Sequence, residues 1–279
     1  MIIPTALALG ARQGLVELRQ SLSPGALAGH LLWPAVTLIA IVLLGRRSVP
    51  GGPDLGALAL PSALGMFVAF GLVLVIQYLT ADRDDGTLLR AKATPHGISV
   101  YVVGRMITVS VTILGYLVIL LVPGLFIVEG IDLARPGAWF TLTWVLLLGF
   151  IATQSVGVVL GVLVRTPRGT GYVSVLVLGL VAISGVFYPI AALPSWVQWV
   201  GQVFPMYWLG LGMRSALLPE SAAIVEIGQS WRHPETAAVL GTWAAVGLIA
   251  APLVLARMTR RESGSRLAER REQALQRLD

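Results

Sequence analysis

The chain has 279 residues, of which 56% are hydrophobic and only 12% are charged, and its formal net charge is +6. A soluble domain has roughly 45–50% apolar and about 25% charged residues, so this composition excludes an ordinary soluble protein and favours a membrane protein. Because the sequence contains no cysteine, it also excludes a disulfide framework, a thiolate metal site and a cysteine nucleophile.

Residues 1–26 precede the first predicted span and carry Arg12, Glu17 and Arg19. They do not resemble a secretory signal, because no basic residue comes before their apolar part. We expect an amphipathic helix near residues 6–20 that lies on the cytoplasmic membrane surface, with a frayed tail as the alternative.

Six long runs without Asp, Glu, Lys or Arg follow along the chain: 20–45, 55–81, 106–128, 136–164, 169–213 and 236–256. A helix needs about 20 apolar residues to cross the hydrocarbon core, and each run meets this length. The sequence therefore predicts an all-α membrane protein with six transmembrane helices, in one transmembrane domain over residues 1–279. The approximate spans are 27–44, 60–80, 103–125, 138–163, 171–189 and 237–256, so that 27–256 holds the six spans and 257–279 is a basic cytoplasmic tail.

The basic residues predict the orientation of these spans. If the N-terminus is inside, 15 of the 20 Lys and Arg residues lie in cytoplasmic segments. The positive-inside rule therefore favours a multi-pass protein of the inner (plasma) membrane with both termini in the cytoplasm. Because these arginines flank membrane spans, we expect the lipid bilayer, not nucleic acid, as their partner.

The loop between the second and third predicted spans, "TADRDDGTLLRAKATPHG" (80–97), is unusually rich in charge. Asp84 and Asp85 precede "GTLLRAKA", and Arg90 and Lys92 lie near its end, an order that suits the dipole of a short helix. Thr94-Pro95 ends the helix, because the residue before a proline disfavours the helical conformation. We expect a cytoplasmic helix, either bound to a partner or simply solvated.

The segment after the fifth span is apolar but contains Pro189, Pro194, Pro205 and Pro219, which disfavour one straight helix. An aromatic-aliphatic face recurs at helical spacing between these prolines, at Trp196, Trp199, Val200, Val203 and Phe204. We expect short helices that form a re-entrant outer hairpin before the last span, with a seventh span as the alternative.

Several kinds of chemistry are missing from the sequence. The only lysine, Lys92, has no glycine-rich loop before it, so there is no Walker A motif. His30, His96 and His233 are far apart in the sequence, which argues against a histidine metal site, and no hydrolase motif occurs. We therefore predict no catalytic residue, no metal and no cofactor in this chain, and energy for any uphill movement must come from a partner.

Small and polar residues inside the spans leave alternatives open. Gly149, Thr153, Gly157 and Gly161 share one helix face and permit close helix approach, either between subunits or within one subunit. The polar residues Gln77, Tyr78 and Gln154 are candidates for a substrate path, with ordinary interhelical hydrogen bonding as the alternative.

Two separated motifs resemble the permeases of type-2 ABC transporters (ABC-2 type). "DRDDGTLLRAKATP" is similar to the first cytoplasmic loop of these proteins, although many relatives carry glutamates in place of Asp84 and Asp85. "ISGVFYPIAALPSWVQWVGQVFPMYWLGLGMRSALLP" (183–219) is similar to their fifth span and outer hairpin. The matching positions are Ser184, Gly185, Pro189, Leu193, Pro194, Trp196, Pro205 and Arg214.

The resemblance implies a permease subunit that forms a homo- or heterodimer and binds two separate ATPase subunits, which carry ATP and Mg. It implies that the loop helix couples the ATPase to the membrane helices through Asp84, Asp85, Gly86, Thr87, Leu88, Arg90 and Pro95. The expected function is ATP-driven export of an amphiphilic drug, antibiotic or lipid-like molecule by alternating access, with the multidrug and daunorubicin-resistance branch as the nearest. The alternatives are a polysaccharide- or lipid-exporting permease, a membrane-bound enzyme of lipid or cell-wall metabolism, and a passive pore.

Overall fold

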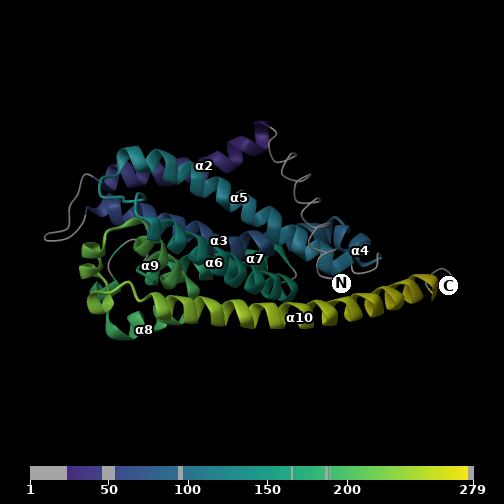
Figure 1. Cartoon of the computed structure of the whole chain (residues 1–279). Helices are drawn as coiled ribbons and strands as arrows, with labels where there is room; N and C mark the ends of the chain where they lie inside the picture. The colour runs from purple at the N-terminus through teal and green to yellow at the C-terminus, as the bar shows by residue number, and fades with distance from the viewer. Residues whose placement is uncertain are drawn as a thin grey trace.

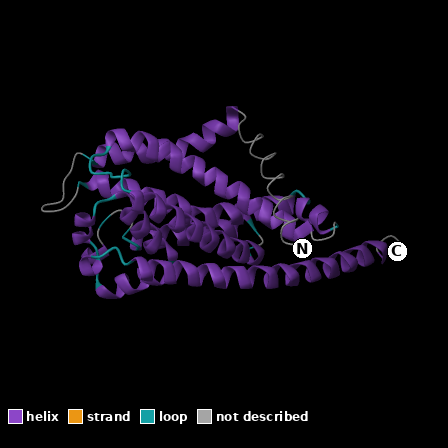
Figure 2. Ribbon diagram, in the orientation of Figure 1, coloured by secondary structure: helices purple, strands orange, loops and turns teal. Residues whose placement is uncertain are grey.

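The computed structural model describes residues 24–45, 54–93, 97–164, 166–185, 188 and 190–275, which are helical almost throughout and include no β-strand (Figure 2). The α-helices are α2 (Pro24–Leu44), α3 (Leu55–Asp84), α4 (Thr87–Lys92), α5 (Gly97–Ile127), α6 (Pro136–Leu163), α7 (Pro167–Ile183), α8 (Ser195–Val203), α9 (Pro205–Leu217) and α10 (His233–Leu275). Three short 3-10 helices are η1 (Ile190–Ala192), η2 (Glu220–Val225) and η3 (Ile227–Gln229). The all-α fold class is confirmed, and the helix expected near residues 6–20 lies outside the described residues.

Prolines and a side-chain cap mark where several helices begin. α6, α7 and α9 each have a proline in their first turn, where the missing N–H costs no helical hydrogen bond. Before α7, the Thr166 hydroxyl accepts a hydrogen bond from the Gly169 N–H at 3.1 Å. A threonine at this position stabilises the helix start because it satisfies a backbone donor that has no partner inside the helix.

Helices α3 and α6 pack against each other along the centre of the molecule (Figure 1). A Cβ atom added to Gly157 of α6 would lie 2.7 Å from the Leu72 carbonyl oxygen of α3, and one added to Gly161 would lie 3.2 Å from Leu79 Cδ2. Only residues without a side chain let two helix backbones approach so closely. The row of small residues on α6 therefore packs within this subunit, one of the two alternatives that the sequence left open.

Helix α9 completes a three-helix core with α3 and α6. All 13 of its residues are buried. A Cβ atom on Gly65 of α3 would lie 2.9 Å from the backbone nitrogen of Gly210, and one on Gly212 would lie 2.9 Å from Val145 Cγ1 of α6. α9 is therefore held in near backbone contact with α3 and in close contact with α6.

The surrounding helices carry large apolar side chains on their outer faces. Exposed examples are Trp33 and Ile39 of α2, Val118 and Phe126 of α5, Val175 and Leu176 of α7, and Ile249 and Leu253 of α10. A soluble monomer rarely exposes so much apolar surface, whereas a bilayer covers it. This distribution supports a multi-pass membrane protein.

Among the residues that the structure describes, four helices have the length and hydropathy needed to cross a membrane: α3, α5, α6 and the first 23 residues of α10. Helices α2 and α7 coincide with the other two predicted spans, but their apolar stretches, 31–43 and 168–183, are shorter. Two of the predicted segments between spans lie at opposite ends of the molecule (Figure 1). α4, in the loop between the second and third predicted spans, is at one end. α8 and α9, in the segment after the fifth predicted span, are at the other.

The segment after α7 is broken into short helices, as the prolines predict. α8 has 9 residues and α9 has 13, and Phe204 between them is extended. Because a spanning helix needs about 20 residues, one straight seventh span over this segment is wrong. Trp196 and Trp199 of α8 are 70% and 73% exposed, so the predicted aromatic face points away from the core.

The close contact between α3 and α6 can be tested by adding one methyl group. We expect Gly157→Ala to lower the free energy of unfolding by about 1–3 kcal/mol, because the new Cβ overlaps the backbone of α3. Gly115→Ala is the matched control, since nothing lies within 4 Å of a Cβ atom there, and the better helix propensity of alanine stabilises it by up to about 1 kcal/mol. Unfolding of both purified variants in detergent measures the difference, and equal stability of the two contradicts the packing.

Candidate functional site

Helices α3 and α4 form a helical hairpin at one end of the molecule. After α3 ends, the Asp85 N–H donates to the Ala81 carbonyl at 2.9 Å and the Gly86 N–H donates to the Arg83 carbonyl at 3.2 Å. Gly86 has a φ of +70°, which glycine adopts without strain. The Arg90 N–H then donates to the Gly86 carbonyl at 3.2 Å, so that a single tight turn joins the two helices.

The α3–α4 hairpin combines a buried leucine with exposed charged side chains. Leu88 is buried, and the helix contacts both α3 and α5. Asp84, Asp85 and Arg90 are exposed, and Arg90 Nη2 donates to the Asp85 carbonyl at 3.3 Å. The hairpin of α3 and α4 therefore presents both signs of charge on its surface, while Leu88 packs α4 against its neighbours α3 and α5.

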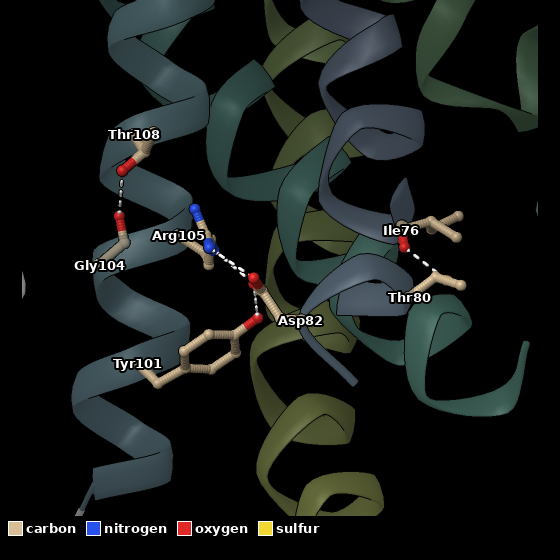
Figure 3. A network of polar contacts seen from close by, with 7 residues as sticks. All are labelled: Ile76, Thr80, Asp82, Tyr101, Gly104, Arg105 and Thr108. Atoms are coloured by element: carbon tan, nitrogen blue, oxygen red, sulfur yellow. Dashed lines mark hydrogen bonds and ion pairs between the residues drawn. The ribbon is translucent and has the colours of Figure 1, made fainter. Parts of the chain in front are cut away.

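A buried carboxylate fastens the end of α3 to the start of α5, as Figure 3 shows. Arg105 binds Asp82 with two parallel contacts, Nε to Oδ2 at 2.6 Å and Nη2 to Oδ1 at 2.7 Å. The Tyr101 hydroxyl donates to the same Asp82 Oδ2. We call these three residues the Asp82 clasp. A bidentate, charge-assisted pair of this kind fixes both distance and orientation.

The aromatic surroundings of Arg105 add to the Asp82 clasp. The Arg105 guanidinium carbon lies 4.8 Å from the centre of the Tyr78 ring and 5.8 Å from that of Tyr101. A cation above an aromatic face is attracted by the electrons of the ring. Arg105 is thus held by a carboxylate and two rings, which fixes the loop that contains α4 at both of its ends.

Arg83 fastens the same end of α3 to α6. Its Nη1 donates to the Val164 carbonyl at 3.0 Å, and its Nη2 donates to the Gly161 carbonyl at 3.1 Å. These carbonyls lie in the last turn of α6 and directly after it, where the helix itself supplies no donors and a cation is favoured by the helix dipole. The end of α3 that carries α4 is therefore bonded to both α5 and α6.

Asp82, Arg83, Tyr101 and Arg105 were not among the functional residues predicted from the sequence. A signal for the Asp82 clasp was present, because Tyr101 and Arg105 are four residues apart and so share one face of a helix. Their pairing with Asp82 could not be derived, since it depends on how α3 and α5 cross. Of the predicted coupling residues, Asp84 to Leu88 and Arg90 lie together in the hairpin, and Pro95 lies outside the described residues.

The residues predicted for the outer hairpin lie at the end of the molecule opposite α4. Ser184 is buried at the end of α7, and Gly185 follows with a φ of +62°. Pro194 precedes α8, Pro205 begins α9 and Arg214 is buried near the end of α9, whereas Pro189 lies outside the described residues. The structure brings Pro205 and Arg214 into the core but leaves Trp196 on the surface.

The three candidates for a substrate path are not gathered at one place. Gln77 is exposed, and Tyr78 lies beneath Arg105. Gln154 is fully buried and donates from Nε2 to the Ser110 hydroxyl at 2.8 Å, which is a hydrogen bond between α6 and α5. Among the described residues, no group of three or more His, Asp or Glu side chains could hold a metal ion.

Comparison with known proteins gives one family match. A family model described as ABC-2 type transporter matches residues 8–218, which is well over half of the chain. The matched region includes α4 and the whole Asp82 clasp. No curated protein matches the chain.

The Asp82 clasp predicts a large effect for one small substitution. We expect Asp82→Asn to lower the free energy of unfolding by about 3–5 kcal/mol, because it leaves the Arg105 guanidinium largely buried without its counter-charge. Asp84→Asn is the control, and as a change at an exposed position it should shift stability by no more than about 0.5 kcal/mol. Denaturant unfolding of the purified proteins compares them, and a loss below 1 kcal/mol for Asp82→Asn contradicts the assigned role.

Proposed function

This chain belongs to the ABC-2 type transporter family, and we propose that it is the membrane-spanning permease subunit of an ATP-driven exporter. Its cargo is an amphiphilic molecule such as a drug, an antibiotic or a lipid-like compound, moved out of the cell by alternating access. Within the family we assign it to the multidrug and daunorubicin-resistance branch.

The observation that carries this proposal is the way α4 is held. The turn before α4 exposes Asp85 and α4 itself exposes Arg90, so the α3–α4 hairpin offers charges of both signs to a partner protein. Its buried Leu88, the Asp82 clasp and the bonds of Arg83 to α6 connect it to three long helices. A short helix that is charged outside and rigidly anchored inside suits the transfer of movement from a partner into a membrane domain.

The energy source in this proposal is a separate ATPase. The chain has a single lysine and no Walker A motif, so it lacks the loop that P-loop ATPases use to hold the phosphates of ATP. Two ATPase subunits, which carry ATP and Mg, bind the α4 ends of a permease dimer. Closure of the ATPase subunits around ATP moves α4, and α3, α5 and α6 follow.

The proposed complex sits in the inner membrane with six spans per chain. α2 and α7 complete the set of spanning helices, and both termini and α4 lie in the cytoplasm, in keeping with the concentration of basic residues on that side. α8 and α9 form the outer hairpin. The exposed tryptophans of α8 then lie at the headgroup level of the outer leaflet, where tryptophan is favoured.

Substitution of the exposed charges of the α3–α4 hairpin tests the coupling. We expect Asp85→Asn combined with Arg90→Gln to reduce copurification of the ATPase and nucleotide-dependent export by about tenfold or more, because polar contacts at the interface are lost. Glu220→Gln is the matched control, since Glu220 is exposed at the opposite end. Pull-down and transport assays measure both quantities. If the double variant retains full ATPase binding and export, α4 is not the coupling element.

Single cysteines test the orientation, because the natural chain has none that could give background labelling. With α4 in the cytoplasm, Ser221→Cys should react with a membrane-impermeant maleimide in intact cells, while Asp85→Cys should react only after permeabilisation. Both positions are exposed in the structure, so labelling of both in permeabilised cells serves as the control. The reverse pattern contradicts the proposed orientation, and labelling of both in intact cells contradicts their placement on opposite sides.

A further inference from the structure

A second buried ion pair lies at the end of the molecule opposite α4. Arg214, near the end of α9, places its Nε 2.7 Å from Oε1 of Glu226, which follows η2. Their side chains are only 3% and 2% exposed. Two charges removed from water in this way are costly unless each compensates the other, so the pair ties the two segments together strongly.

Arg214 also reaches α3. Its Nη1 donates to the Ser62 hydroxyl at 2.9 Å, and Ser62 is itself fully buried. One helical turn further along α3, Gly65 lies in near backbone contact with Gly210 of α9. The guanidinium of Arg214 is therefore shared between α3 and the segment that contains Glu226.

Two further contacts hold the end of α9. The Asp132 N–H donates to the Leu217 carbonyl at 2.8 Å, and Arg135 Nη2 donates to the Leu218 carbonyl at 2.5 Å. These carbonyls lie at or just beyond the last turn of α9, where the helix itself supplies few donors. α9 and residues 218–232, which we call the distal cap, are thus attached by several bonds, of which the Arg214–Glu226 pair is the most deeply buried.

We propose that Ser62, Arg214 and Glu226 form a latch that makes the distal cap move as one body with α3. The Asp82 clasp is on the same helix 20 residues away, which is about 30 Å along a continuous α-helix. A displacement of α4 therefore reaches the distal cap through α3. The latch itself stands on the geometry alone, whereas its role in transmitting movement from an ATPase rests on the proposed function.

The chemistry of the latch explains why the attachment is firm. Within the part of the chain that the structure describes, Glu226 Oε2 has no hydrogen-bond partner, so the negative charge of Glu226 is balanced mainly by Arg214. Lifting the distal cap from α3 separates Arg214 from Ser62, and moving residues 218–232 away from α9 separates the two charges. Because a buried charge without its partner is strongly unfavourable, the ion pair keeps α9 and residues 218–232 together as one body. The Arg214–Ser62 hydrogen bond and the close contact of Gly65 with Gly210 hold this body on α3.

Hydrogen exchange of the full-length protein in detergent tests the latch without any ATPase. We expect Glu226→Gln to increase amide exchange in residues 205–232 by about 100-fold, because the cap opens locally once Arg214 has lost its counter-charge. Exchange in α4 and in the first turns of α5 should stay within twofold of the natural protein. The matched control is Glu235→Gln, which breaks the more exposed Arg232–Glu235 pair, 3.6 Å apart, and should leave the cap unchanged.

Two outcomes overturn the latch: exchange in residues 205–232 that stays within twofold of the natural protein, or an equal increase along the whole chain. Ser62→Ala provides a milder variant in case Glu226→Gln does not fold. It removes only the hydrogen bond between α3 and Arg214 and should accelerate exchange in the cap by about tenfold. An unchanged cap in Ser62→Ala contradicts the attachment to α3.

A spin label at Ser221→Cys in the distal cap tests transmission in the complex with the ATPase. In the natural background we expect ATP and Mg to change the label spectrum, and in Glu226→Gln we expect this change to be lost while the ATPase remains bound. A full nucleotide response in Glu226→Gln overturns the transmission. If the natural complex binds no ATPase or shows no nucleotide response, the proposed function fails, and the hydrogen-exchange result still decides the latch.

Discussion

The close backbone contact of α3 with α6 and α9 is the constraint on which the rest of the molecule depends. Gly157 and Gly161 bring α6 onto α3, and the pair Gly65 and Gly210 brings α9 onto it. At such distances the helices cannot slide or separate without losing many small contacts at once, because interiors are packed as densely as organic crystals. α3 therefore acts as the fixed axis to which the other elements are attached.

The paired charged residues that contact α3 lie near its two ends. At one end the Asp82 clasp and Arg83 attach α3 to α5 and α6, and at the other end Arg214 links α3 to Glu226. The stretch of α3 between Ser62 and Asp82 contains no charged residue. This arrangement follows from the cost of placing unpaired charge in hydrocarbon, which confines ionisable groups to helix ends or to matched pairs.

The charged loop illustrates what a pattern can and cannot predict. Its short helix was predictable, because carboxylates, leucines and a proline occur in the order that a helix start, body and end require. Asp84 nevertheless belongs to the last turn of α3, and Asp82 and Arg83 serve as anchors rather than as part of a solvated surface. Arg105 is 23 residues from Asp82, and Gly161 and Val164 are 78 and 81 residues from Arg83, separations at which local patterns carry no information.

By itself the sequence determined the all-α class, the positions of the long apolar helices, the break into α8 and α9, and the presence of a charged helix between α3 and α5. These features depend on local composition, on proline geometry and on the length that a membrane imposes. Only the tertiary structure decided that the small residues of α6 pack within the subunit, and that Asp82 and Arg214 are paired with Arg105 and Glu226. Such choices depend on which helix faces meet, and that is set by packing across the whole chain.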